Sequence, residues 1–341
     1  MSSNLFIRII FLPFLLFNIT FAFAQKHKPE DFGYRFVQTL YKKDTVNLVI
    51  VSKKGEAMKK KPVILFEKGS LPIPLIIEDD RGFFPIMPFD TKIFTEDYHL
   101  VFISKPGVPV RYPAHELSPR MEYNDPKTGL VPQFYQERNH LDYYVSRDVQ
   151  ILKFLKKQPW VDKNKMVIAG HSEGGTIMAK LATVSKDVTH VISSGQNPFG
   201  QMATIMAQTR AYDDSAGTYA NAQFEFWEKL VNKSPDIPFP AGYNLEQQYR
   251  YQYGFSLPAI DYFKRIKVPV LVSYGTKDNC ALYNDYMRIT MIREQKKNFT
   301  FLPYIGLEHN YFKLDEQGKA IPDNVGWNNA AKDWKAWLEK Q

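Results

Sequence analysis

The stretch that decides the fold is VIAGHSEGGTI, residues 167–177, in which an apolar run meets a serine set between glycines. Gly170, Ser172 and Gly174 fit the pattern Gly-x-Ser-x-Gly, which carries a nucleophilic serine where it follows a strand and opens a helix. Such a turn strains the serine backbone and projects its Oγ from the edge of a sheet. Glycines lack the β-carbon that would collide with the flanking strand and helix. The stretch therefore predicts that Ser172 is a nucleophile.

Short apolar runs alternate with helical patterns along the rest of the chain. The candidate strands are 46–51, 62–67, 99–104, 165–170, 189–194, 268–274 and 299–304. Most are apolar throughout, as in central strands that helices cover on both faces. Apolar residues spaced by three and four indicate helices at 141–155 and 331–338. This alternation predicts parallel βαβ units, and so an α/β fold with a mostly parallel central sheet flanked by helices.

Two long segments interrupt this alternation. Residues 105–140 form a polar, proline-bearing stretch, and residues 196–267 separate two neighbouring strands and are rich in Phe, Tyr and Trp. Functional side chains gather beyond the carboxyl ends of parallel strands, and long insertions at that edge are commonly lids or binding loops. We expect a loop insertion at 105–140 and a lid insertion at about 196–267.

Two further residues complete a candidate catalytic triad. A serine hydroxyl is a weak nucleophile, so a base must take its proton and a third group must orient that base. The chain order for this architecture is serine, acid, histidine. Asp278 follows the next-to-last candidate strand and His309 follows the last one. Both are therefore expected at the sheet edge that holds Ser172.

Neighbouring residues offer rival assignments. Asp285 lies too far beyond its strand, and Glu308 adjoins His309 in a loop, where consecutive side chains rarely bond each other. His171 lies on the strand side of the turn and is expected to pack structurally. The assignment to Asp278 and His309 is therefore preferred.

Acyl transfer also needs donors for the developing oxyanion. One is expected to be the backbone N–H of Glu173, at the start of the predicted helix. The other is expected from the loop KGSLP, residues 68–72, where Pro72 has no N–H to donate. Ser70 is preferred over Leu71 as this second donor. The side chain of Glu173 either tunes the site by its charge or points to solvent.

The N-terminus predicts export. Arg8 is the only charged residue before position 25, and the apolar run that follows it is short for a membrane span. Ala22 and Ala24 give the small-x-small pattern of a signal peptide. We expect a signal peptide at 1–24 cleaved after Ala24, one domain at 25–341, and a periplasmic or secreted protein without a stable membrane anchor. The alternative is an N-terminal anchor.

Composition argues against other classes of function. The net charge is +8, with lysines gathered in SKKGEAMKKKP, residues 52–62. A solvated hairpin tip explains this cluster better than a nucleic-acid site, since no nucleic-acid motif accompanies it. Cys280 is the only cysteine and is expected to be a buried apolar residue. No His, Cys, Asp or Glu cluster has ligand spacing, so neither a metal nor a cofactor is expected.

Four segments resemble those of the α/β-hydrolase superfamily. They are ILFEKGS at 64–70, VIAGHSEGG at 167–175, LVSYGTKD at 271–278 and GLEHNY at 306–311. In character they are most similar to dienelactone-hydrolase-like and prolyl-oligopeptidase-like members, in which Gly-His-Ser-x-Gly-Gly is frequent. The resemblance covers residues from about 62 to the C-terminus, without the two insertions.

This resemblance implies an α/β-hydrolase fold with Ser172 as nucleophile, Asp278 as orienting acid and His309 as base. One departure concerns the oxyanion loop, because many members have His-Gly where this chain has Lys68-Gly69. The oxyanion donor is therefore less firmly implied than the triad.

The leading hypothesis is a metal-independent serine hydrolase that cleaves an ester, thioester or amide bond through an acyl-enzyme on Ser172. A carboxylesterase-type activity on a small substrate is preferred. The aromatic residues of the lid insertion indicate a partly apolar substrate, or alternatively they form the core of the lid itself. The alternatives, in order, are a small-peptide hydrolase, an acyltransferase and a non-catalytic binding protein. A non-catalytic protein is expected to have lost a triad residue, and this chain has all three.

Overall fold

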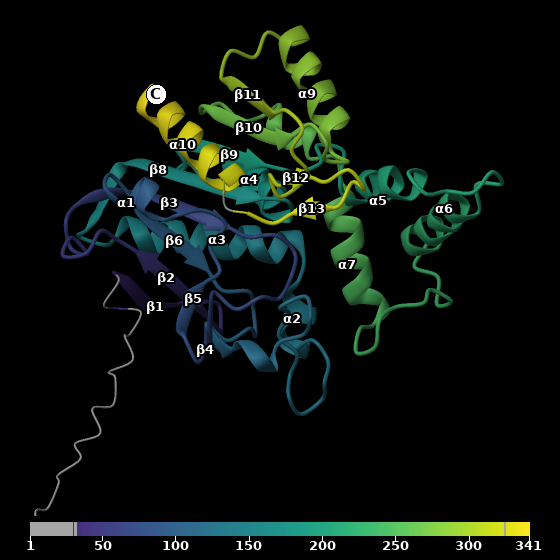
Figure 1. The fold of residues 1–341 in the computed structure, drawn as a ribbon, viewed down its shortest axis with the longest axis horizontal. Helices are drawn as coiled ribbons and strands as arrows, with labels where there is room; N and C mark the ends of the chain where they lie inside the picture. The colour runs from purple at the N-terminus through teal and green to yellow at the C-terminus, as the bar shows by residue number, and fades with distance from the viewer. Residues whose placement is uncertain (1–29, 31–32, 324) are drawn as a thin grey trace, which may run out of the picture.

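The computed structural model describes residue 30, residues 33–323 and residues 325–341 (Figure 1). The predicted signal peptide, 1–24, lies outside the described residues. Eight strands form the central sheet in the order β1-β2-β6-β3-β8-β9-β10-β11. These strands are β1 Tyr34–Tyr41, β2 Asp44–Val51, β3 Lys61–Glu67, β6 His99–Ile103, β8 Val161–His171, β9 His190–Ser194, β10 Val270–Gly275 and β11 Phe299–Tyr304. The last six in the sheet order are parallel, and β2 is antiparallel to both neighbours. The predicted α/β fold with a mostly parallel sheet is confirmed.

Burial explains which strands the sequence reveals. Every residue of β6 and of β10 is buried, as continuous apolar runs predict. All seven predicted strands are present, although β8 begins earlier than expected. The strand β1 is not among the predicted ones, because it lies at the sheet edge and its buried and exposed residues alternate.

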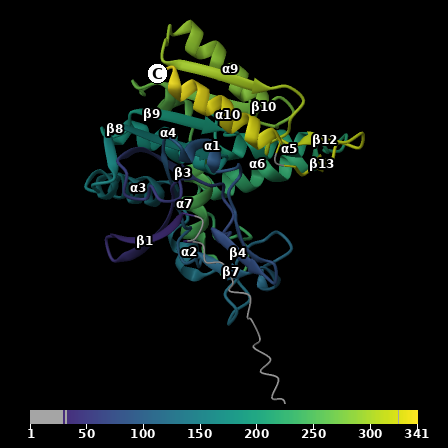
Figure 2. The ribbon, with the colours of Figure 1, turned by 60° about the vertical axis from the view of Figure 1, so that its left-hand side comes forward.

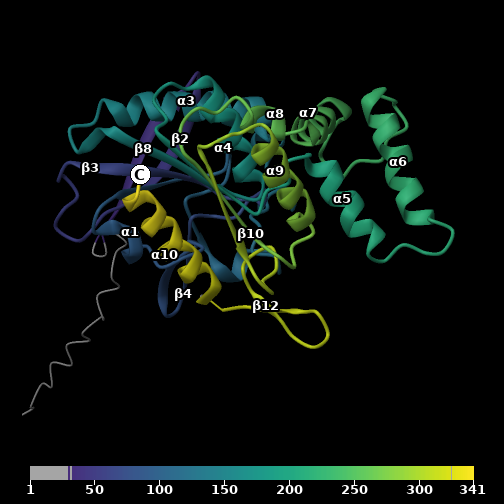
Figure 3. The same cartoon turned by 90° about the horizontal axis from the view of Figure 1, so that it is seen from above.

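Helices cover both faces of the sheet. The helices α3 (Leu141–Lys156), α4 (Glu173–Val184), α8 (Ile260–Phe263) and α9 (Ala281–Arg293) contribute buried side chains to one core cluster. The helices α1 (Lys92–Thr95) and α10 (Val325–Glu339) contribute to the cluster on the opposite face. Figure 3 shows α3 and α10 on opposite sides of the sheet. Within the described residues, no helix combines the length and the apolar character needed to span a bilayer.

The segment between β9 and β10 leaves the body of the molecule. Its helices are α5 (Gln201–Arg210), α6 (Thr218–Val231) and α7 (Leu245–Ser256), which contact one another and project to one side (Figures 1 and 3). The helix α8, also in the range 196–267, instead packs on α4. The expectation that this segment acts as a lid stays a prediction.

The segment 105–140 carries short elements of its own. It contains β7 (Arg111–Pro113), a 3₁₀ turn (Ala114–Glu116) and α2 (Gln133–Arg138). The strand β7 joins β4 (Ile76–Asp79) and β5 (Gly82–Pro85) in a three-stranded sheet, which lies away from β9 and β10 (Figure 2). A two-stranded hairpin, β12 (Lys313–Leu314) and β13 (Ala320–Ile321), precedes α10.

The lysine-rich segment 52–62 is not a hairpin tip. The strands β2 and β3 that flank it are not paired, because β6 lies between them in the sheet. The hairpin prediction was wrong because adjacency along the chain does not fix adjacency in the sheet. The segment is instead a connection that carries the chain past β6.

Candidate active site

Ser172 occupies a strained turn between β8 and α4. Its φ of 57° and ψ of −121° are unusual for a residue with a β-carbon. Its N–H donates to Ser194 O on β9 at 2.8 Å, which fixes the turn to the neighbouring strand. A β-carbon on Gly170 would lie 2.3 Å from Gly174 O, and one on Gly174 would lie 2.3 Å from Glu67 O. Glycine is therefore required on both sides of the serine.

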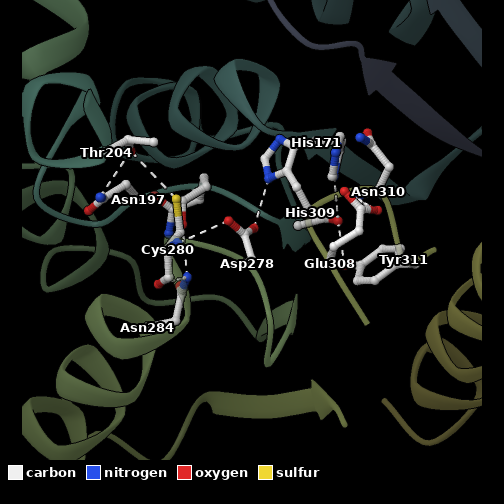
Figure 4. A network of polar contacts seen from close by, with 12 residues as sticks. His171, Asn197, Thr204, Asp278, Cys280, Asn284, Glu308, His309, Asn310 and Tyr311 are labelled. Carbon is white, nitrogen blue, oxygen red and sulfur yellow. Dashed lines mark hydrogen bonds and ion pairs between the residues drawn. The ribbon is translucent and has the colours of Figure 1, made fainter. Parts of the chain in front are cut away.

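Asp278 and His309 meet in the loops that follow β10 and β11. His309 Nδ1 lies 2.7 Å from Asp278 Oδ2. The other oxygen of Asp278 accepts the Cys280 N–H at 2.9 Å, so the carboxylate is held on both sides (Figure 4). Burial disfavours the protonated His309 ring, but the hydrogen bond and charge of Asp278, together with the charge of Glu308, outweigh it and raise the pKa of His309. Ser172, Asp278 and His309 line one cavity.

The two predicted oxyanion donors lie on either side of the serine. The Glu173 N–H is the first of α4, and the loop from β3 passes so close that a β-carbon on Gly69 would be 3.6 Å from Ser172 Cβ. Within the described residues, no protein group accepts from the N–H of Glu173, Ser70 or Leu71. All three are therefore available to a substrate oxygen, and the choice between Ser70 and Leu71 stays a prediction.

The Glu173 side chain does not point to solvent. Its Oε1 lies 2.8 Å from Lys105 Nζ, and the two side chains are 6% and 1% exposed. Lys105 lies two residues beyond the end of β6, and its Nζ is 4.4 Å from the centroid of the Tyr144 ring. Sequence reasoning missed Lys105. The one available signal was a lysine just beyond the carboxyl end of a mostly apolar strand.

A comparison with protein-family models decides the family. The model of the prolyl oligopeptidase family matches residues 133–331, which is more than half of the chain. This range contains Ser172, Asp278 and His309.

The chain belongs to the prolyl oligopeptidase family. The predicted resemblance to the α/β-hydrolase superfamily is confirmed. No curated protein sequence matches the chain significantly.

Solved structures share the fold of this family member. A putative dipeptidyl aminopeptidase IV from Bacteroides ovatus matches with a TM-score of 0.56 and 12% identity, over 90% of this chain and 36% of its own. Acylaminoacyl peptidase from Pyrococcus horikoshii matches with a TM-score of 0.53 and 14% identity, over 90% of this chain and 41% of its own. Est1E from Butyrivibrio proteoclasticus, with ferulic acid bound, matches with a TM-score of 0.56 and 14% identity, over 89% of this chain and 100% of its own. The chain therefore spans less than half of these two peptidases and the full length of Est1E.

His171 belongs to a buried network behind the site of this family member. Its Nδ1 lies 2.9 Å from Ser194 Oγ, which lies 2.6 Å from Tyr311 Oη, and Tyr311 Oη lies 2.9 Å from Ser273 Oγ. The His171 ring packs on the His309 ring with centroids 4.8 Å apart. Burial, and next the charge of His309, lower the pKa of His171 well below its usual range. His171 is therefore neutral and packs against His309.

The rival residues have other partners. Glu308 Oε1 accepts the N–H groups of Asn310 and Phe312 at 2.7 and 3.0 Å, and Asp285 accepts the Tyr274 hydroxyl. Neither forms an ion pair with His309 among the described residues. Nor do those residues contain a group of three or more His, Cys, Asp or Glu side chains that could hold a metal ion.

Two cavities meet at the serine. The polar cavity, about 440 Å³, extends under α5 and is lined by Gln201 and Thr204. The apolar cavity, about 640 Å³, extends along the loop after β3. Its apolar lining residues are Phe66, Leu71, Ile73, Ile86, Met87, Pro88 and Trp327. Ser172 and His309 line both cavities. When a substrate places a bond at Ser172, the two parts of the substrate on either side of that bond therefore each have a cavity.

Proposed function

We propose that this prolyl oligopeptidase family hydrolase cleaves esters of small, partly apolar substrates through an acyl-enzyme on Ser172. The observation that carries the proposal is the 2.7 Å contact between His309 Nδ1 and Asp278 Oδ2, in a cavity that Ser172 also lines. With the Nδ1 proton donated to Asp278, Nε2 of the neutral ring is the basic nitrogen.

The proposed reaction has two halves. His309 Nε2 takes the proton of Ser172 Oγ as Oγ bonds to the substrate carbonyl carbon, and the N–H groups of Glu173 and Ser70 donate to the carbonyl oxygen as it becomes negative. His309 then gives this proton to the leaving alkoxide, and the acyl group stays on Ser172. Water attacks the acyl carbon while His309 takes a water proton, and that proton returns to Ser172 Oγ as the acid leaves.

The carboxylates of the polar cavity support ester cleavage over release of N-terminal residues. A peptide α-ammonium group needs an acidic partner when it is buried. The cavity is lined by the carboxylates of Glu173, Asp278 and Glu308, and each of these carboxylates already has a partner within the protein. Glu173 pairs with Lys105, Asp278 with His309, and Glu308 with two backbone N–H groups. Est1E, which this chain matches over its full length, holds ferulic acid, an aromatic carboxylic acid.

A fluorophosphonate probe tests the nucleophile. The wild-type protein is expected to be labelled, and Ser172→Ala, with folding verified by circular dichroism, is expected to remain unlabelled. A folded wild-type protein that takes no label would overturn the serine-hydrolase proposal.

Two substrate panels separate the candidate activities. 4-Nitrophenyl esters of increasing chain length are compared with aminoacyl 4-nitroanilides, and the esters are expected to give the higher kcat/KM. A higher kcat/KM for the anilides would favour the second candidate, a small-peptide hydrolase, which the family's peptidase neighbours support. Product analysis with added alcohol acceptors tests for acyl transfer, which would give a new ester in place of the free acid.

We also propose that the chain is exported and processed after Ala24. The small-x-small pattern at Ala22 and Ala24 supports this proposal. Expression of the full chain in a Gram-negative host is expected to yield periplasmic protein that begins at Gln25. Protein that keeps its first residues and sediments with membranes would instead indicate an N-terminal anchor.

A further inference from the structure

The two cavities at Ser172 differ in charge. The polar cavity is lined by three carboxylates, Glu173, Asp278 and Glu308, and by one lysine, Lys277. The lining of the apolar cavity contains no Asp or Glu but contains two cations, Lys68 and Arg120. The half of a substrate that enters the apolar cavity therefore meets positive charge among apolar side chains.

Lys68 lies in the loop after β3, two residues before Ser70, whose N–H is the proposed oxyanion donor. Its Nζ donates to Ile73 O at 3.0 Å and to Pro74 O at 3.4 Å. An ammonium group has three donors, so one remains for a ligand. No carboxylate pairs with Lys68 within the described part of the chain.

The two lysines that are buried among the described residues have acidic partners, whereas Lys68 is half-buried. Lys61 Nζ lies 2.6 Å from Glu56 Oε2, and Lys105 Nζ lies 2.8 Å from Glu173 Oε1. A charge withdrawn from water without an opposite charge is costly, so pairing is the expected arrangement. Lys68 departs from this arrangement at the wall of a cavity that Ser172 and His309 also line.

We propose that Lys68 binds an anionic group of the substrate, of the carboxylate class, at the end of an apolar moiety held in the apolar cavity. This inference rests on the proposed function and specifies its substrate class. Arg120 has a smaller part, because it is 70% exposed and its Nη2 already lies 3.6 Å from Glu122 Oε1. Exposed charges are screened by water and contribute little to binding.

A purely structural role for Lys68 makes a different prediction. Its two bonds to backbone carbonyls close the loop 68–74, and loss of those bonds alone would weaken the binding of neutral and anionic ligands alike. Recognition of an anion instead changes the ratio of the two affinities. The ratio is therefore the decisive measurement.

The experiment compares 4-phenylbutyrate with 4-phenylbutan-1-ol as ligands of full-length Ser172→Ala, by ligand-observed NMR titration. A hydrogen bond to a charged group predicts a Kd about 10- to 100-fold lower for the carboxylate. Adding Lys68→Met is expected to abolish this preference. Adding Lys60→Met, which removes one exposed positive charge from the surface, is the matched control and is expected to keep it.

Several outcomes would overturn the proposal. They are equal affinity of the two ligands for the starting protein, absence of binding, an unchanged preference in Lys68→Met, or complete loss of the preference in Arg120→Gln. Binding to Ser172→Ala does not depend on turnover, whereas fluorophosphonate labelling of the wild type tests the proposed function by itself. Failure of the Lys68 proposal is therefore distinguishable from failure of the proposed function.

The pH dependence of binding to the starting protein gives a second test. Burial, and next the charge of Lys105, lower the pKa of Lys68 to about 7. The charged form is present below that value, so the preference for the carboxylate is expected to fall as the pH rises from about 6 to about 8.5. Besides Lys105, paired with Glu173, the charged or titratable side chains at this cavity are Arg120, His171 and His309.

Of these groups, His171 stays neutral, whereas His309 has a raised pKa and can also change its charge as the pH rises. The carboxylate preference is measured against pH in the starting protein and in Lys68→Met or Lys68→Gln. The part of its pH dependence that is lost in these variants is assigned to Lys68. A preference that does not change with pH in the starting protein would contradict the assignment.

Discussion

The buried ion pair between Lys105 and Glu173, next to the proposed nucleophile Ser172, allows a quantitative test. Lys105→Met removes the ammonium group that faces Glu173 at 2.8 Å, while a side chain of similar length remains. Because the two side chains are 1% and 6% exposed, the Glu173 carboxylate stays buried and loses its opposite charge. Breaking one partner of such a pair costs about 3–5 kcal/mol of the free energy of unfolding.

Urea unfolding followed by tryptophan fluorescence measures this cost. Lys105→Met/Glu173→Gln removes both charges and is expected to recover at least half of the loss, since replacement of a whole buried pair is close to neutral. Lys53→Met is the matched control, because Lys53 pairs with Glu96 at 2.6 Å with both side chains exposed, and no measurable change is expected. A loss of less than about 1 kcal/mol in Lys105→Met would refute the reasoning from burial.

Three further predictions concern the site. Asp278→Asn is expected to lower kcat for ester hydrolysis roughly 10⁴-fold, because His309 loses the group that fixes its tautomer, and a loss of less than tenfold would contradict that role. The kcat/KM of the wild type is expected to rise with pH as His309, whose pKa is raised, loses its proton, since the neutral ring is the base. In Asp278→Asn this rise should move to lower pH, because the hydrogen bond and charge of Asp278 that raise the pKa of His309 are lost. Cys280 is expected to resist iodoacetamide at about pH 8 in the native protein, because burial and the charge of Asp278 raise its pKa to about 12. It should react once the protein is unfolded in urea, and rapid labelling of the native protein would contradict this prediction.

The strands that surround the site follow from local sequence. Central strands such as β6 and β10 are buried on both faces, so their apolar runs are continuous and recognisable. The edge strand β1 has an alternating pattern of burial in which apolar residues, Phe36 and Leu40, are also exposed. The short strands β4, β5 and β7 have too few residues for periodicity to appear. The mistaken hairpin at 52–62 has a related cause, because strand order in a sheet is set by long-range pairing.

In the candidate site too, some features follow from local sequence and others depend on long-range contacts. Ser172, Asp278 and His309 each follow a recognisable strand, so topology alone brings them to one edge of the sheet. Lys105 and Glu173 are 68 positions apart, and nothing in either neighbourhood indicates that the two side chains meet. The same holds for Tyr311 and Ser194, which are 117 positions apart. Contacts that depend on side-chain direction across the sheet have no local signature.

The close approach of Gly174 to the carbonyl of Glu67 has a consequence for how such a protein diversifies. It joins the turn after β8 to the end of β3, and Gly170 pairs with Glu67 in the same register. These contacts fix the position of the proposed nucleophile, Ser172, relative to the loop that offers an oxyanion donor. The helices α5 and α7, which wall the polar cavity, are not part of these contacts. Changes in those helices can select new substrates while the reacting groups keep their distances.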